Sequence, residues 1–276
     1  MRRLLVVFSH DKGGRSMNWL RFRHDGSVKF GTVEDELITV HVGDMFSGAI
    51  PTDETLLFEH VELLPPVQPG KIVGMANNFH ALISKVGGMV PAEPLYFIKT
   101  NTSLHAGGKP IRRPKAYDGK IIFEGELGLV IGRTCRDVEA SAALSYFFGC
   151  TCVNDVTAIG LLNKDPTFAQ WTRSKAADTF GVLGPVITTG LDLSTLRVTT
   201  TLNSQERQNY PVSDMIFAPA ELISHLSHDM TLEAGDVIAC GTSIGVGSMR
   251  NGDVVTVRID GIGSISNRFD DRHNDQ

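Results

Sequence analysis

The stretch from Ile121 to Asp155 constrains the fold more than any other part of the chain. Its first half alternates, with apolar side chains at the odd positions Phe123, Leu127, Leu129 and Ile131. This period of two predicts a strand with one buried face and one solvent-facing face. Glu124 and Glu126 then point to the same face of that strand.

Two carboxylates roughly 6 to 7 Å apart along one strand face repel each other unless water or a cation lies between them. Alone, the pair Glu124 and Glu126 favours a solvated acidic face. Asp155, however, closes a second apolar run, residues 147–153, and the break at Asn154 and Asp155 indicates a strand end. Three carboxylates with open positions for water and substrate predict a catalytic Mg²⁺ site, because Mg²⁺ prefers oxygen ligands.

Length and composition limit the class of protein. The 276 residues predict one large domain, or one domain with a small one, and a 42% hydrophobic content is typical of a soluble globular protein. The formal net charge of -5 provides no basic field for nucleic acid, and no apolar run is long enough for a membrane helix. The four cysteines form no metal-ligand pattern, so we expect buried free thiols and a cytoplasmic protein.

The chain divides into three predicted segments. Residues 1–16 form an N-terminal extension that can supply an extra strand. Residues 17–68 form a small N-terminal β domain of short alternating runs joined by turns, and they end in a proline-rich linker. Residues 69–276 form the core domain, which we expect to be catalytic.

Strand-like runs outnumber helical ones in the core. Helices are expected at 78–86, at 137–148, where the apolar spacing is clearest, and at 219–227, where Glu221 lies in the first turn. Runs typical of strands include 196–203 and 254–259. The predicted fold class is α+β, mostly β, with a mixed sheet and a few flanking helices.

Several ordered blocks of the sequence resemble the fumarylacetoacetate hydrolase superfamily. The first two blocks, 123–127 (FEGEL) and 153–157 (VNDVT), are similar to its metal-binding segments. The similarity continues through WTRSK at 171–175, LEAGDVI at 232–238 and the glycine-rich segment 241–247. Residues 19–30 and LLPP at 63–66 are similar to the small domain that precedes the core in bacterial members.

This resemblance implies a mixed β-roll core, a homodimer, and one Mg²⁺ or Mn²⁺ ion per subunit. It also implies a small-molecule substrate, an oxo acid or diketone with adjacent or β-related carbonyls. By position, Glu124, Glu126 and Asp155 match the metal ligands of the family. Lys175 matches a lysine beside the substrate, and Thr242 matches a threonine that contacts it.

The common chemistry of such a site passes through an enolate, whose charge a bound metal stabilises as a Lewis acid. Lys175 can add positive charge, although a lone lysine is usually a surface residue. Thr242 lies in a glycine-rich turn, where backbone amides can approach a ligand closely. His80 is the candidate general base, because its ordinary pKa is near neutral.

The sequence departs from the family pattern at three positions that bear on substrate and mechanism. Ile83 stands where members have a glutamate that holds the histidine, and Ile159 stands where many have an arginine for a substrate carboxylate. Ala76 replaces an asparagine of the segment before His80. We therefore expect a retained metal site with a more apolar pocket and weaker activation of water.

Three functions follow from these observations. The first is a Mg²⁺-dependent hydrolase that cleaves a carbon-carbon bond of a β-dicarbonyl or 2-oxo acid, such as an acylpyruvate. The second is a metal-dependent decarboxylase or keto-enol tautomerase or isomerase on an oxaloacetate-like acid, which needs chiefly the electron sink and one proton donor. The third is a family member without catalytic activity.

Overall fold

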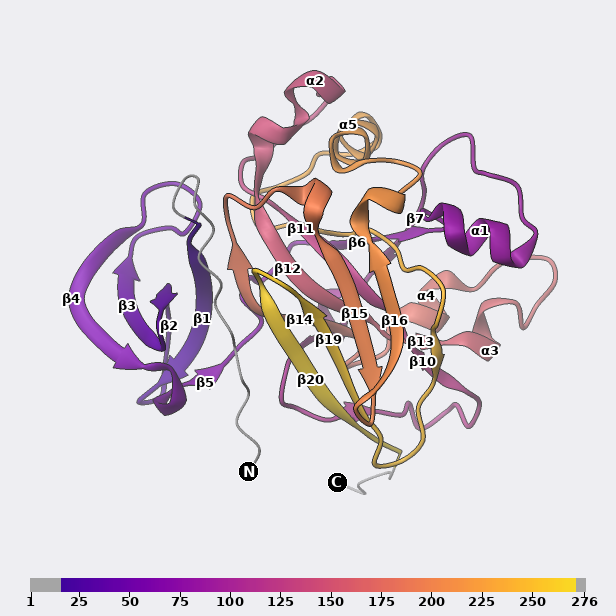
Figure 1. The fold of residues 1–276 in the computed structure, drawn as a ribbon, viewed down its shortest axis with the longest axis horizontal. Coiled ribbons are helices and arrows are strands. Elements are labelled where there is room, and N and C mark those ends of the chain that lie inside the picture. The colour runs from indigo at the N-terminus through magenta and orange to yellow at the C-terminus, as the bar shows by residue number, and fades with distance from the viewer. Residues whose placement is uncertain (1–15, 272–276) are drawn as a thin grey trace.

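A computed structural model describes residues 16–271 of the chain, and strands make up most of its regular structure (Figure 1). The short helices lie at the periphery of the sheets. This confirms the predicted mostly β fold with a few flanking helices. The strand expected in the N-terminal extension falls on residues 1–15, which are outside the described part.

The largest sheet is mixed and contains twelve strands within residues 16–271. Its strands are β1 (Asn18–His24), β2 (Ser27–Glu34), β3 (Leu37–Val42), β4 (Ile50–Leu57), β5 (Glu62–Leu63), β6 (Ile72–Ala76), β7 (Leu95–Lys99), β8 (Leu104–Ala106), β11 (Gly125–Ile131), β12 (Phe147–Asp155), β14 (Gly181–Thr188) and β17 (Val237–Ala239). The main path runs β4-β3-β2-β1-β14-β12-β11-β17-β6-β7, with β5 beside β1 and β8 beside β14.

The first four strands pair antiparallel and curve away from the core (Figure 1). The alternating runs and turns of the N-terminal segment indicated β1, β2 and β3, whereas β4 was not predicted. The four strands do not form a sheet of their own, because β1 pairs with β14 of the core through Asn18↔Thr188 and Trp19↔Ile187. Main-chain pairing thus crosses the predicted boundary between 68 and 69. The division into a small domain and a core domain stays a prediction.

Two smaller sheets complete the strand structure. One contains β10 (Ile121–Phe123), β13 (Thr157–Ala158) and β18 (Gly247–Ser248). The other contains β9 (Ile111–Arg112), β15 (Arg197–Leu202), β16 (Gln205–Pro211), β19 (Val254–Ile259) and β20 (Gly263–Asp270). The observed β15 and β19 agree with the strand-like runs expected at 196–203 and 254–259.

The large sheet buries apolar side chains on both of its faces. On one face, Leu127 and Leu129 of β11 belong to the main apolar cluster, together with Val257 of the five-stranded sheet. On the other face, Val130 belongs to a second cluster that includes Trp19 of the N-terminal unit. The sequence predicted a half-buried strand here, and that was wrong: all seven residues of β11 are buried.

The described helices are α1 (His80–Val86), α2 (Ala140–Ala143), α3 (Ile159–Leu162), α4 (Trp171–Lys175) and α5 (Pro219–Asp229). Helix α1 is followed by Gly87, whose φ of 66° is left-handed and ends the helix. The end of the predicted helix 78–86 is therefore correct. Helix α5 begins where predicted, and the Glu221 carboxylate accepts a hydrogen bond from the Ala218 amide at 2.7 Å.

The helix predicted at 137–148 is wrong over most of its length. Only α2 is α-helical, a 3-10 turn follows at Leu144–Tyr146, and β12 begins at Phe147. Helix α5 explains the start of this segment. The Val138 amide donates to Ser227 Oγ at 2.9 Å, and the Val138 carbonyl accepts from Ser224 Oγ at 2.7 Å, in competition with a helical amide four residues on. Asp137 itself has a left-handed φ of 52°, which is not helical.

Between residues 16 and 271 no helix is long and apolar enough to cross a membrane. All four cysteines are buried and unpaired, as the sequence predicted. Burial raises the pKa of the Cys150 and Cys152 thiols, the latter to about 12, so these groups stay protonated at neutral pH and behave as small apolar side chains.

Ser227→Ala is expected to lower the free energy of unfolding by about 1 to 3 kcal/mol, because it leaves the buried Val138 amide without an acceptor. Urea unfolding followed by circular dichroism measures the change. Ser145→Ala is the matched control, since Ser145 is exposed, and a change within about 0.5 kcal/mol is expected. Equal effects of the two substitutions would contradict the role given to Ser227.

Candidate active site

The three acidic residues singled out in the sequence converge at one end of the large sheet. Strands β11 and β12 pair antiparallel in a register that sets Gly125 opposite Asn154. The Asp155 amide donates to the Glu124 carbonyl at 2.8 Å, which draws the two backbones together there. One carboxylate oxygen from each of Glu124, Glu126 and Asp155 lies within 4.8 Å of the other two. The predicted grouping is therefore present.

Burial makes this grouping electrostatically costly. The side chains of Asp155 and Glu126 are each about 1% exposed, whereas that of Glu124 is 13% exposed and marks the open side. Burial raises the pKa of Glu126 well above its usual value, and the charges of Asp155 and Glu124 raise it further. Burial also raises the pKa of Glu124, where Lys175 opposes the shift.

The donor set fits a hard divalent cation. All three groups offer carboxylate oxygens, which suit Mg²⁺ or Mn²⁺ and not a thiophilic metal. A cation among these oxygens offsets the repulsion that raises the pKa of Glu126. The residues that would hold it are Glu124, Glu126 and Asp155.

Lys175 reaches this cluster from helix α4. Its Nζ donates to Asp155 Oδ2 at 2.6 Å and to Glu124 Oε2 at 2.7 Å. The same Nζ lies 4.8 Å from the centre of the Phe97 ring, which is stacked on Trp171 with centroids 5.0 Å apart. Burial by itself lowers the pKa of Lys175, but the neighbouring carboxylates outweigh burial and raise it, so the ammonium group stays charged.

A second buried lysine, Lys99, was missed by sequence reasoning. It ends β7 and is completely buried, and its Nζ donates to Asp155 Oδ1 at 2.5 Å and to the Lys175 carbonyl at 2.6 Å. Burial lowers the pKa of Lys99, and the Asp155 charge opposes that shift. The only sequence signal was a lysine at the end of the apolar run 96–98, which strand alternation alone does not distinguish from a surface residue.

The Thr242 side chain is hydrogen-bonded to the backbone of Gly125, the residue between Glu124 and Glu126. Its Oγ1 donates to the Gly125 carbonyl at 3.0 Å and accepts from Gln208 Nε2 at 2.8 Å. The preceding Gly241 has a φ of 91°, which favours glycine, and its amide donates to Glu126 Oε2 at 2.9 Å. The turn at 241–242 therefore fixes the position of Glu126. The predicted contact of Thr242 with substrate stays a prediction.

Two residues of β16 also support the glutamates and carried no distinct sequence signal. Gln208 Oε1 accepts from the Gly125 amide at 3.0 Å, and the Tyr210 hydroxyl donates to the Gly125 carbonyl at 2.5 Å. Both side chains are buried. The five-stranded sheet thus anchors Gly125, and through it the two carboxylates on either side.

His80 is not brought into the carboxylate cluster by any direct contact. It is exposed at the first position of α1, and within residues 16–271 its ring makes no hydrogen bond or ion pair. The start of this helix is nevertheless tied to the site. Asp214 Oδ2 accepts from the Ala81 amide at 3.0 Å, and Asn78 Nδ2 donates to the Cys240 carbonyl at 2.9 Å, next to Gly241.

The two isoleucines that depart from the family pattern lie in different environments. Ile83 is buried, with 4% of its surface exposed, and its side chain is apolar, so no carboxylate comes from that position. Ile159 is 39% exposed at the start of α3 and presents apolar surface. Ala76, the third departure, is partly buried at the end of β6.

Comparison with known proteins identifies the family. Residues 71–270 match the sequence profile described as fumarylacetoacetate (FAA) hydrolase C-terminal, which is more than half of the chain, and residues 17–66 match the one described as Rv2993c-like, N-terminal. The chain belongs to the fumarylacetoacetate hydrolase superfamily. The resemblance drawn from the sequence blocks is thereby confirmed, while the roles of single residues stay predictions.

Members of the superfamily with several different names are similar to this chain. Protein Rv2993c of Mycobacterium tuberculosis is 40% identical over 210 residues, which cover 75% of this chain and 78% of that protein. Oxaloacetate tautomerase YisK of Bacillus subtilis is 34% identical over 237 residues, covering 79% and 78%. The solved structure of 2-hydroxyhepta-2,4-diene-1,7-dioate isomerase from Mycobacterium marinum matches with a TM-score of 0.85 and 33% identity, over 94% of this chain and 100% of that one.

Lys99→Met is expected to lower the free energy of unfolding by about 2 kcal/mol or more, because it removes one of the two cations that hold the buried Asp155 carboxylate. Addition of Asp155→Asn should recover part of this loss, since an amide needs no counter-charge. Chemical denaturation of the single and double variants gives the coupling free energy between Lys99 and Asp155. Lys164→Met, on an exposed lysine, is the control, and a Lys99 effect no larger than this control would contradict the assignment.

Mg²⁺ is expected to raise the melting temperature of the protein, and Glu126→Gln should abolish the rise. At about a hundred times the dissociation constant, binding adds about 2.7 kcal/mol of stability. Differential scanning calorimetry with and without Mg²⁺ measures this. Glu139→Gln, an exposed glutamate outside the cluster, should keep the full shift. A shift that survives in Glu126→Gln would place the binding elsewhere.

Proposed function

We propose that this superfamily member is an enzyme that interconverts the keto and enol forms of a small 2-oxo acid, or shifts the double bond of a related enol acid. The observation that carries the proposal is the cluster of Glu124, Glu126 and Asp155 with the charged Lys175 against it. A divalent cation, Mg²⁺ or Mn²⁺, held by the three carboxylates would supply a Lewis acid that stabilises an enolate. Lys175 would add positive charge at the site, and His80 would move the proton.

Charge balance supports an anionic substrate. Three ionised carboxylates against the ammonium groups of Lys99 and Lys175 leave one negative charge, and a divalent cation turns this into one positive charge. In a buried site, such an excess favours a carboxylate ligand. Lys175, whose pKa is raised, keeps its proton at neutral pH and donates hydrogen bonds to oxygen atoms that gain charge.

The surroundings of His80 favour tautomerisation over hydrolysis. Hydrolysis requires an activated water, and the base for that task is normally oriented by a neighbouring carboxylate, which also stabilises the positive charge that the base gains when it takes the proton. Within residues 16–271 no carboxylate contacts the His80 ring, and Ile83 lies in the core. Keto-enol exchange needs only one group to move a proton, which an exposed His80 can do. The names of the Bacillus subtilis tautomerase and the Mycobacterium marinum isomerase support the same choice.

Hydrolysis of a carbon-carbon bond, the function preferred from the sequence, is the second candidate. The observation in its favour is again His80, whose exposed ring has no protein partner in the described chain and is free to bind a water molecule. The exposed Ile159 then suits an acylpyruvate or diketone with an apolar end. Decarboxylation of an oxaloacetate-like acid uses the same electron sink.

The homodimer and the cytoplasmic location also stay predictions.

Purified protein with Mg²⁺ should accelerate the loss of the enol form of oxaloacetate, followed by ultraviolet absorbance, and Lys175→Met should lower kcat by about 100-fold or more. Lys164→Met is the control and should leave kcat unchanged. A parallel panel of acylpyruvates and diketones separates the candidates, because release of acid pairs would favour hydrolysis. A chain that binds Mg²⁺ but acts on none of these compounds would support the non-catalytic alternative.

A further inference from the structure

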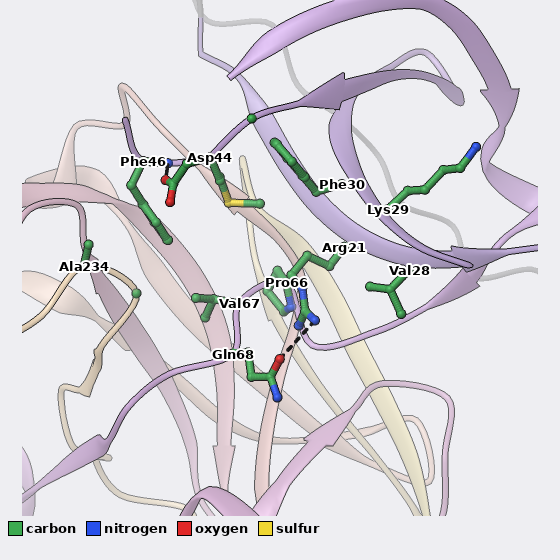
Figure 2. A pocket seen from close by; sticks show the side chains of 13 residues that line it. Arg21, Val28, Lys29, Phe30, Asp44, Phe46, Pro66, Val67, Gln68 and Ala234 are labelled. Carbon is green, nitrogen blue, oxygen red and sulfur yellow. Dashed lines mark hydrogen bonds between the residues drawn. The ribbon is translucent and has the colours of Figure 1, made fainter. Parts of the chain in front are cut away.

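A pocket of about 300 Å³ lies between the N-terminal unit and the core (Figure 2). Strands β1 and β2 and the loop 43–46 form one side, and residues 66–68 with 234–235 form the other. None of the side chains that line it belongs to the candidate active site. The volume suits a small organic molecule.

Arg21 of β1 contributes to this pocket a positive charge that has no carboxylate partner within residues 16–271. Its guanidinium donates to the Pro65 carbonyl at 3.1 Å and to Gln68 Oε1 at 3.4 Å, and both acceptors are neutral. A guanidinium has five N–H donors, so three of them remain without an acceptor from the described chain. Burial lowers the pKa of Arg21, which reflects the cost of holding this cation half-buried.

The other charged residues of the pocket already have partners. Lys29 Nζ donates to both carboxylate oxygens of Glu54, at 2.6 and 2.8 Å. Asp44 Oδ1 accepts from the amides of Phe46 and Ser47, and Figure 2 shows Asp44 beside Phe46 and apart from the Arg21 guanidinium. Arg21 is thus the charged group of this pocket that has donors to spare.

The walls around Arg21 are apolar and aromatic. Phe30 of β2 and Phe46 lie on opposite sides of the pocket, Pro66 lies beside Arg21, and Val67 lies on the side of Phe46 (Figure 2). Phe30 and Phe46 are half-buried and adjoin the second apolar cluster, in which Trp19 lies 6.5 Å from Phe30 between ring centroids. A molecule that fills the space would therefore place an apolar body on these rings.

From this arrangement we infer that the pocket binds a small monocarboxylate with an apolar body, in addition to any substrate at the carboxylate cluster. The ligand carboxylate accepts from the free N–H groups of Arg21, and its hydrocarbon part covers Phe30 and Phe46. The bound acid bridges the N-terminal unit to the segments that lead into β6 and β17. Binding therefore stabilises the whole chain.

Cyclohexanecarboxylate is a suitable probe, with cyclohexanecarboxamide as its uncharged match. Isothermal titration of the full, metal-free chain should give binding of the acid and at least roughly tenfold weaker binding of the amide. Arg21→Gln should weaken binding of the acid by a similar factor, whereas Lys29→Gln should change it less than about twofold, because the Lys29 charge is already neutralised by Glu54.

The two tryptophans report the two sites separately. In a Trp171→Phe chain, the fluorescence of Trp19 should change on addition of the acid, and in a Trp19→Phe chain the fluorescence of Trp171, beside Lys175, should not. The inference is overturned if Arg21→Gln binds the acid as well as the unchanged protein does, if the amide binds equally well, if Lys175→Met abolishes binding, or if no heat is detected up to about 10 mM acid. Loss of the proposed enzyme activity would leave these outcomes unaffected.

Discussion

The candidate site depends on the burial of three carboxylates within a few ångströms of one another. In the protein interior such a group of like charges is unstable unless cations or protons balance it. Lys99 and Lys175 supply two positive charges, while burial and the charges of Asp155 and Glu124 raise the pKa of Glu126. A divalent cation among the three carboxylates would oppose that rise, because it stabilises their ionised forms.

Much of the surrounding fold holds this cluster in place. Gly125, between the two glutamates, is bonded to Gln208, Tyr210 and Thr242, which come from the five-stranded sheet and from the turn after β17. Helix α4 supplies Lys175, and edge strand β7 supplies Lys99. Since these elements are far apart in sequence, the geometry of the site requires the complete roll of sheets and not one local motif.

The N-terminal unit is joined to this roll more closely than a flexible attachment would be. Its first strand extends the large sheet, and Trp19 packs among core residues such as Val130. The contact buries the outer face of β11 and leaves the pocket around Arg21 at its margin. The same contact explains why the alternation in residues 121–131 misled the prediction: a face that carries carboxylates at one end is covered by apolar packing at the other.

The sequence alone determined the class of the fold, the short hairpin strands at the N-terminus, the helix that ends at Gly87, and the grouping of Glu124, Glu126 and Asp155. These features follow from local periodicity, from glycine conformation, and from ordered blocks that identify a superfamily. Only the tertiary structure decided that Lys99 is buried against Asp155, that Ser224 and Ser227 bind the backbone of residue 138, and that no other carboxylate within residues 16–271 reaches the His80 ring in place of the one missing at Ile83. The reason is that each of these depends on which side chains meet across strands distant in sequence, and period and propensity describe only neighbours along the chain.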